Sequence, residues 1–161
     1  MAGPERFILG EYVRRLDDRY RLVIPQELCE QLLGESSQGI LAKDRPGCLS
    51  LWSAEVWQSK WDTGVELIKQ KMRAGRLEDQ IGRLQRFGRL LSTRHITVQV
   101  APRGRLLIPE GFREFLAVEP KGDVVVVGAA VCVEIWSPPA WAKYLEQHIP
   151  QFRRLFDRLS Q

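Results

Sequence analysis

The sequence predicts an α+β protein, mainly β, that is built from two tandem repeats with peripheral helices. The first observation is an internal repeat: "LDDRYRLVIP", which begins at Leu16, is similar to "VAPRGRLLIP", which begins at Val100. The second is that each copy contains short β-branched stretches bounded by polar or glycine-containing turns, which is the pattern of strands. The third is that the same shift of 84 residues aligns later positions without a gap, namely Cys48, Trp52, Ser53 and Trp57 with Cys132, Trp136, Ser137 and Trp141.

Each copy opens with two strands joined by a short polar loop. The first strands are "YVRRL" and "ITVQV", the loops "DDRY" and "PRG", and the second strands "RLVI" and "RLLI". Pro25 and Pro109 follow where proline is well tolerated, at the start of a helix, because an N–H there would have no partner. Gly34 is expected to end the first helix. Each helix should bury one face through apolar side chains spaced i, i+4: Leu28 with Leu32, and Phe112 with Leu116.

A hairpin follows in each copy. "GILAKDRPGCLSLW" is predicted to turn at "DRPG", and "DVVVVGAAVCVEIW" to turn around residues 128–130. The run "DVVVV" does not alternate, which predicts a strand buried on both faces. Ser53 and Ser137 are expected to cap two further helices. The tryptophans of those helices are expected to pack on the sheet as core residues: Trp57, Trp61 and Trp141.

The chain is predicted to divide into a first repeat at 7–62, a basic helical linker at 63–90, a second repeat at 91–148 and an amphipathic C-terminal tail at 149–161. From Glu66 to Arg94 there are eight Lys or Arg and three acidic residues, and Gly75 is expected to break the helix. This basic face fits either simple solvation or contact with phosphates. The linker also has an apolar stripe: Ile81, Leu84, Phe87, Leu90 and Leu91.

The composition allows a polyanionic partner without requiring one, because the net charge is only +4. The three cysteines are widely spaced and form no CxxC pair, so we expect reduced and mainly buried thiols. There is no charged-then-apolar leader, and no apolar run approaches the roughly 20 residues that span a bilayer. We therefore expect a cytoplasmic protein with no membrane partner.

A loop of the form D-x-x-x-R followed by L-x-I-P and a short helix resembles the signature of the SpoVT/AbrB superfamily of DNA-binding proteins. Two such copies, each with a hairpin ending in "CLSLW" or "CVEIW" and a tryptophan-bearing helix, resemble the bacterial MraZ family from residue 7 to about 148. The resemblance implies a swapped-hairpin, AbrB-like β-barrel in which each repeat forms one half. It also implies a ring-like homo-oligomer, associated with the nucleoid, that binds double-stranded DNA at short G-rich direct repeats and represses its own cell-division and cell-wall operon.

The two loops match the family motif unequally. Asp17 and Arg21 fit D-x-x-x-R in the first copy, whereas the second copy keeps Arg105 but has Ala101 in place of the aspartate. A bulky residue replaces the loop glycine in the first copy and is expected to reshape that turn, because it resists a positive φ. The residues at this position are Tyr20 in the first copy and Gly104 in the second.

Arginine presents a rigid fork that can pair with O6 and N7 of guanine, so Arg21 and Arg105 are predicted to read bases in the major groove. Asp17 is predicted to hold Arg21 in one rotamer. From the loop alone, an ion pair that closes the loop without any ligand is an equal alternative. The other expected DNA contacts go to phosphates, which add affinity without sequence information: Arg14, Arg15, Arg19 and Arg103.

Other function classes receive less support from the sequence. His95 and His148 are far apart and have no motif partner, so we expect no catalytic centre, metal, cofactor or small-molecule substrate. One alternative is a protein-interaction or scaffold role of the antitoxin type, in which the amphipathic tail binds a partner. The tail could equally pack on the ring itself. Its apolar residues are Phe152, Leu155, Phe156 and Leu159. Another is an oligomer whose DNA loops have degenerated, which the missing second aspartate would permit.

Overall fold

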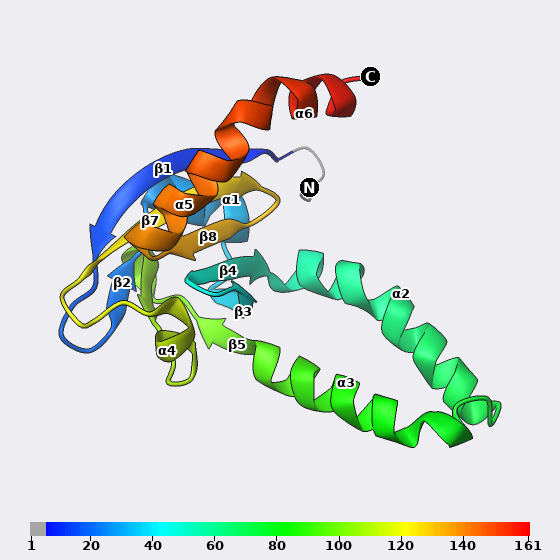
Figure 1. Ribbon diagram of the computed structural model, residues 1–161. Helices are drawn as coiled ribbons and strands as arrows, with labels where there is room; N and C mark the ends of the chain where they lie inside the picture. The colour runs from blue at the N-terminus through cyan, green and yellow to red at the C-terminus, as the bar shows by residue number, and fades with distance from the viewer. Residues whose placement is uncertain (1–5) are drawn as a thin grey trace.

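The computed structural model describes residues 6–161, which form a six-stranded antiparallel sheet, a two-stranded sheet and six α-helices (Figure 1). The strands are β1 (Ile8–Arg15), β2 (Arg21–Val23), β3 (Gln38–Arg45), β4 (Cys48–Ser53), β5 (His95–Gln99), β6 (Arg105–Leu107), β7 (Asp123–Ala130) and β8 (Val133–Trp136). The helices are α1 (Gln26–Leu33), α2 (Ala54–Arg73), α3 (Ile81–Arg94), α4 (Phe112–Leu116), α5 (Pro138–His148) and α6 (Phe152–Leu159). Short 3-10 turns are η2 (Glu78–Gln80), η3 (Pro102–Gly104) and η4 (Ile149–Gln151). This confirms the predicted α+β class with a mainly antiparallel sheet.

The two repeats share their sheets. The strand order of the large sheet is β1-β7-β8-β4-β3-β5. The pairs β1–β7, β4–β8 and β3–β5 each join the first repeat to the second, and so does β2–β6 in the small sheet. Only the hairpins β3–β4 and β7–β8 pair strands of the same repeat. The repetition in the sequence therefore has a structural reason: a strand set this small cannot bury its own apolar face, and the other copy supplies the missing strands.

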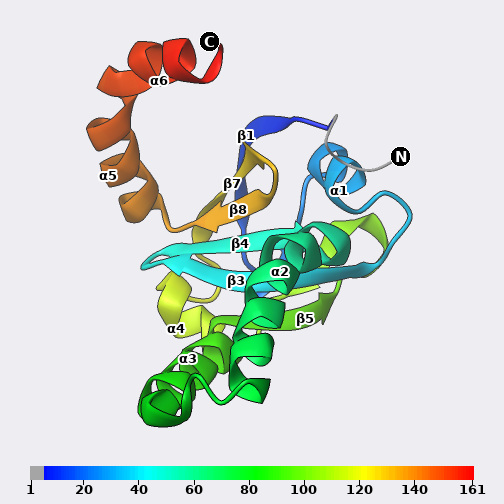
Figure 2. The same cartoon turned by 90° about the vertical axis from the view of Figure 1, so that its right-hand side faces the viewer.

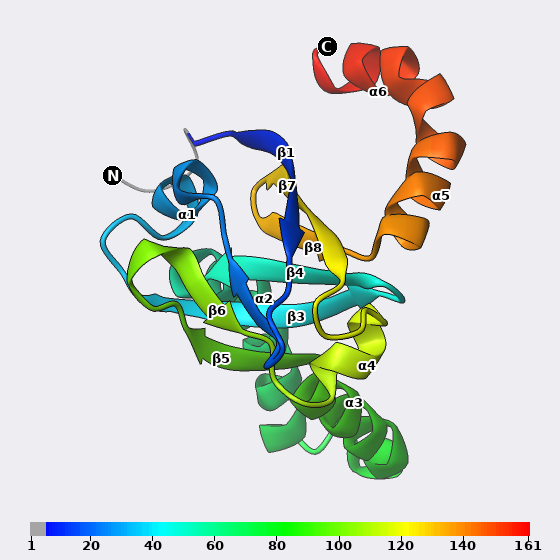
Figure 3. The ribbon, with the colours of Figure 1, turned by 90° about the vertical axis from the view of Figure 1, so that its left-hand side faces the viewer.

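The strands do not close into the expected barrel. β1 and β5 are the opposite edges of the large sheet and do not pair with each other. β2 and β6 are only three residues long, and they form a separate ribbon that lies across the sheet in Figure 3 instead of bridging its two edges. Within residues 6–161 the architecture is therefore an open sheet covered by a ribbon.

The main core lies between this ribbon and the large sheet. Leu22 and Leu106, paired across the ribbon, have exposed fractions of 0% and 1% and pack with Leu41 of β3 in one apolar cluster. Residues 124–126 of β7 are buried, as the unbroken valine run predicted. The predicted inner faces of α1 and α4 are also confirmed as buried: Leu28, Leu32, Phe112 and Leu116.

The predicted helix caps are confirmed in both repeats. Ser53 Oγ accepts a hydrogen bond from the Val56 N–H at 3.2 Å, and Ser137 Oγ accepts one from the Ala140 N–H at 3.3 Å. Each serine thus satisfies one of the N–H groups that a helix start leaves without a partner.

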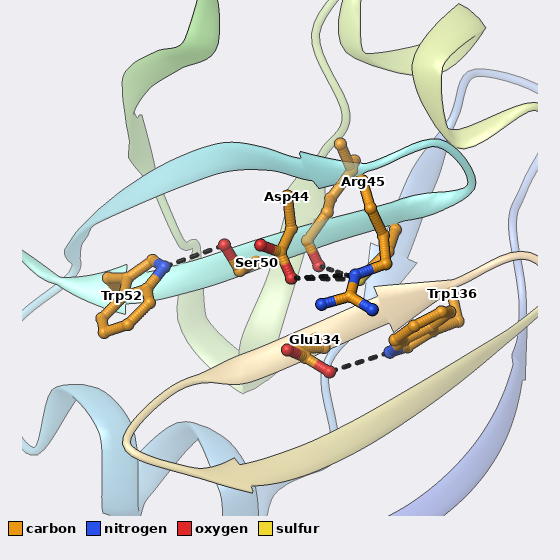
Figure 4. Close-up of polar contacts among 8 residues, drawn as sticks. Asp44, Arg45, Ser50, Trp52, Glu134 and Trp136 are labelled. Carbon is orange, nitrogen blue, oxygen red and sulfur yellow. Dashed lines mark hydrogen bonds and ion pairs between the residues drawn. The ribbon is translucent and has the colours of Figure 1, made fainter. Parts of the chain in front are cut away.

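The tryptophans are only partly core residues. Trp57 is buried as predicted, whereas Trp61 and Trp141 are half-buried. Two further indoles are also buried, Trp52 and Trp136 at the ends of β4 and β8. Figure 4 shows that each donates to a side chain two residues earlier, Trp52 to Ser50 Oγ at 2.8 Å and Trp136 to Glu134 Oε1 at 2.9 Å.

The second hairpin turns slightly later than expected. β7 continues to Ala130, so the turn lies at residues 131–132. Gly128 remains inside the strand because β1 passes very close to it: a Cβ at this position would lie 2.8 Å from Ile8 O and from Leu9 Cα. The glycine therefore serves the close approach of two strands and not the turn.

The region between the repeats forms a helical arm, α2 and α3, which projects from the sheet (Figures 1 and 2). Its break lies where predicted, at Ala74 and at Gly75, which has a φ of +72°. The apolar stripe of α3 is largely exposed in the single chain, with exposed fractions of 53% for Ile81 and 59% for Leu90. Among residues 6–161, no helix is both long and apolar enough to cross a membrane.

Candidate nucleic-acid interface

The ribbon of β2 and β6 brings the two predicted base-reading arginines onto one surface. Its register pairs Arg21 with Leu107 and Val23 with Arg105, on either side of the buried Leu22–Leu106 pair. Since successive residues of a strand point to opposite faces, these four side chains share the face turned away from the core. All four are exposed. We call this surface the ribbon face.

Arg21 and Arg105 are related by the repeat and lie diagonally across the ribbon face. Because β2 and β6 are antiparallel, the loops that precede them lie at opposite ends of the ribbon. Each loop extends the ladder by one bond: Ile24 N–H donates to Gly104 O at 2.8 Å, and Ile108 N–H donates to Tyr20 O at 2.9 Å. The interface is therefore a single rigid ribbon with an arginine near each end.

Asp17 stabilises the first loop through three hydrogen bonds. Its Oδ1 accepts the backbone N–H groups of Arg19 and Arg21, both at 2.8 Å, and its Oδ2 accepts the Arg21 Nε–H at 2.7 Å. The pKa of this carboxyl is lowered, chiefly because the Arg21 N–H bond stabilises the ionised form. The Arg21 side chain is still 54% exposed. Asp17 thus orients the guanidinium without removing it from solvent, as predicted.

The second loop keeps the closing backbone bond of the first but not its carboxylate, and its backbone differs at Arg103, which has a positive φ where the equivalent Arg19 does not. Ala101 N–H donates to Arg105 O at 2.8 Å, which is the counterpart of the Asp17 N–H bond to Arg21 O at 3.0 Å. The Arg105 Nε–H has only a long bond, at 3.3 Å, to the carbonyl of Pro102. Arg105 is therefore held less firmly than Arg21, because a neutral carbonyl is a weaker acceptor than a carboxylate.

The expectation that Tyr20 resists a positive φ is wrong. Tyr20 has a φ of +60° and its equivalent, Gly104, a φ of +77°, so both turns use the left-handed region. The strain at Tyr20 is offset by packing, since its ring lies 4.5 Å from the guanidinium of Arg113 and contacts the main core. Arg113 in turn donates from Nε to Ile108 O at 2.6 Å, which fixes it beneath the loop.

The four arginines predicted to contact phosphates are spread around the ribbon. Arg19 and Arg103 are exposed at the two loops, and Arg103 has a φ of +68°. Arg15 lies 3.8 Å from Asp123 in an exposed ion pair, which is weak enough to exchange for another anion. Arg14 bonds to the Val13 carbonyl and lies over the ring of Tyr12, so it is the least available of the four.

The sequence reasoning missed the two apolar members of the ribbon face. Val23 and Leu107 each have an exposed fraction of 50%, although both occupy short strands in the centre of the protein. The signal was present, because alternation in "RLVI" and "RLLI" puts the first and third residues on one face. These side chains could contact the methyl group of thymine beside a guanine-reading arginine.

A second polar cluster lies on the large sheet, away from the ribbon. Ligand atoms of Asp44, Cys48 and Glu134 lie within 4.8 Å of one another. Each group already has a protein partner: Figure 4 shows Arg45 Nε 3.9 Å from Asp44 Oδ2, and Glu134 accepts the indole of Trp136. Burial raises the pKa of the Cys48 thiol, which opposes the thiolate that a metal ion needs. The cluster therefore supplies no free set of metal ligands.

Comparison with known proteins adds independent information. Residues 97–160 match the family described as "MraZ protein, putative antitoxin-like". The transcriptional regulator MraZ of Heliobacterium modesticaldum is 32% identical over 151 residues, which cover 94% of this chain and 95% of that protein. The regulator of the same name from Thermomicrobium roseum is 30% identical over 138 residues, covering 86% and 87% of the two chains. That of Caldanaerobacter subterraneus subsp. tengcongensis is 28% identical over 153 residues, covering 95% and 96%. These relatives are regulators and not enzymes, in agreement with the expectation of no catalytic centre.

Proposed function

Because the chain belongs to the MraZ family of transcriptional regulators, we propose that it regulates transcription by binding double-stranded DNA through the ribbon face. The observation that carries this proposal is the diagonal placement of Arg21 and Arg105 on an exposed two-stranded ribbon. A ribbon of this kind fits the major groove, where an arginine fork pairs with a guanine. The target is therefore a duplex with guanines near both ends of the contacted segment.

Asp17 contributes by preorganisation. A guanidinium that is already oriented loses less side-chain entropy on binding than a free one. Arg19 and Arg103 at the loops, together with Arg14 and Arg15 on β1, are proposed to contact the phosphates that flank the bases. Such contacts position the ribbon and make the affinity depend on salt.

The finer features that the family resemblance implies are part of the same proposal. The protein is a repressor of its own cell-division and cell-wall operon, acts in the cytoplasm on the nucleoid, and recognises short G-rich direct repeats as a ring-like homo-oligomer. Several chains on successive repeats would raise affinity through effective concentration, since one ribbon makes a small interface. We also propose that the two repeats interleave as swapped hairpins; the strand pairs that join the two repeats support this arrangement.

A titration of G-rich repeat DNA over a range of salt concentrations tests this proposal. Arg21→Ala and Arg105→Ala are each expected to lower affinity for the G-rich duplex about 5- to 150-fold and to reduce its preference over an unrelated duplex. Arg19→Ala is expected to weaken both duplexes alike and to reduce the salt slope by about one. Arg154→Ala, on the outer side of α6, is the matched control and should bind as the parent does.

The second candidate is a protein-binding scaffold of the antitoxin type with degenerate DNA loops. Ala101, which removes the carboxylate from the second loop, favours it. The same titration separates the two: a parent chain that discriminates no better than Arg21→Ala and Arg105→Ala would support the scaffold and exclude base reading.

A further inference from the structure

The C-terminal helix α6 carries an apolar face that is exposed among residues 6–161. Figure 1 shows it extending from α5, away from the sheet. Residues spaced i, i+3, i+4 and i+7 form the face. Their exposed fractions are 68% for Phe152, 53% for Leu155, 56% for Phe156 and 75% for Leu159. An apolar stripe this exposed normally marks a surface that another molecule covers.

A groove of about 790 Å³ lies on a different part of the molecule. It is bounded by the end of α1, the start of β1, the start of α2 and the β7–β8 turn. Its apolar lining includes Leu32, Leu33, Val56 and Val131, and Val131 is 57% exposed. Figure 2 shows α6 well apart from α1, the helix whose end borders the groove.

The helix and the groove have complementary charge. Two glutamates, Glu35 and Glu55, stand at the groove, with Arg6 as the opposing charge. Arg6 donates from Nη1 to Gln31 O at 2.8 Å, a neutral acceptor, so the groove keeps one positive charge beside its two negative ones. On α6, helical periodicity sets Arg153 and Arg158 on either flank of the apolar face. Arg153 Nε lies 3.2 Å from Asp157 Oδ1 on the same helix, so Arg158 carries the positive charge offered to a partner. The helix therefore offers an apolar stripe flanked by Arg158 to an apolar groove in which negative charge is in excess.

We propose that α6 of one copy of this chain docks into the groove of a second copy. The contact deepens the self-association proposed above and rests on it. Since the two surfaces differ, the contact is heterologous: each copy offers its helix to one neighbour and its groove to another. Such head-to-tail contacts close into rings when the rotation between copies permits. The ribbon face belongs to neither surface.

The test is the molar mass of the full-length protein by light scattering over a range of concentrations. Phe156→Asp and Arg158→Glu are each expected to raise the concentration for half-assembly at least tenfold. Arg154→Glu makes the same charge change as Arg158→Glu but on the outer side of α6, so it should assemble like the parent. Combining Arg158→Glu with Glu35→Arg or Glu55→Arg should restore assembly in at least one of the two pairs, because a salt bridge of reversed polarity would form.

Two results would overturn the proposal in different ways. If the parent assembles and Phe156→Asp and Arg158→Glu assemble equally well, α6 is not the contact, although self-association stands. If the parent stays monomeric at every concentration, both the contact and the proposed self-association are wrong. DNA binding is measured separately on a duplex with one site, where Arg158→Glu should match the parent and Arg21→Ala should not. Failure of the DNA proposal is thus distinguished from failure of the contact.

Discussion

Gly104→Ala is expected to destabilise the protein strongly. Gly104 has a φ of +77°, and a Cβ there would run into the carbonyl oxygen of Ile24. The left-handed conformation costs an alanine about 1–2 kcal/mol. Relief of the clash must move the backbone and weaken the 2.8 Å bond from the Ile24 N–H to Gly104 O. Ile24 is fully buried, so leaving that N–H unsatisfied costs about 1–3 kcal/mol. Together these give about 2–5 kcal/mol.

The assay is urea unfolding at a fixed protein concentration, because self-association would make the midpoint depend on concentration. Gly88→Ala is the matched control: it lies in the exposed arm helix α3, and a Cβ there meets nothing within 4 Å. It should stabilise the protein by about 0.5–1 kcal/mol through helix propensity. The two substitutions therefore have opposite signs. Equal unfolding midpoints would refute the claim that the second loop is closed by backbone contact at Gly104.

Three further outcomes follow from charges and caps. Asp17→Asn should lower the urea midpoint at neutral pH. The pKa of Asp17 in the folded protein lies below its ordinary value of 3.8, so the stability difference between parent and variant is complete above pH 3.8. That difference disappears as the pH falls through the lowered pKa. Burial raises the pKa of Cys132 to about 12, so mild alkylation at about pH 8 should modify Cys29 before Cys132. Peptide masses would show which cysteine is modified. Labelling of Cys132 before the protein unfolds would contradict its burial. Ser137→Ala removes a helix cap and should cost about 1 kcal/mol in thermal unfolding, whereas Ser92→Ala on the exposed arm should be neutral or slightly stabilising.

Local structure could be predicted from the sequence where one physical rule dominates. Proline and serine positions set the starts of α1, α2 and α5, and alternation or its absence set the buried faces of the strands. Whether the strands close into a barrel could not be predicted in the same way, because closure depends on strand length. β2 and β6 reach only three residues, and nothing in "RLVI" indicates that pairing stops there. The role of Gly128 was hidden for a related reason, since β1 is over a hundred residues away in sequence.

The candidate site was predictable in its parts and not in its layout. The motif residues Asp17 and Arg21 come together as expected because they are four residues apart in one loop. The diagonal relation of Arg21 to Arg105 depends on the register of β2 against β6, which joins segments far apart in the chain. The conformation of Tyr20 was misjudged because the sequence shows a bulky residue in a glycine position but does not show that Arg113 packs on its ring.

The divergence of the two loops bears on how a nearly symmetric ribbon could read a direct repeat. If both arginines were held alike, the pseudo-twofold relation of β2 and β6 would make the ribbon equally competent in either orientation on DNA. Arg21 is fixed by a carboxylate at 2.7 Å, whereas Arg105 has only a carbonyl at 3.3 Å. Ordering a free side chain on binding costs about 0.5–1.5 kcal/mol, so the proposed contact at the Arg105 end is the weaker one. In the proposed DNA complex, the absence of a carboxylate at Ala101 would therefore give the ribbon a direction, so that successive copies would meet successive repeats in the same sense.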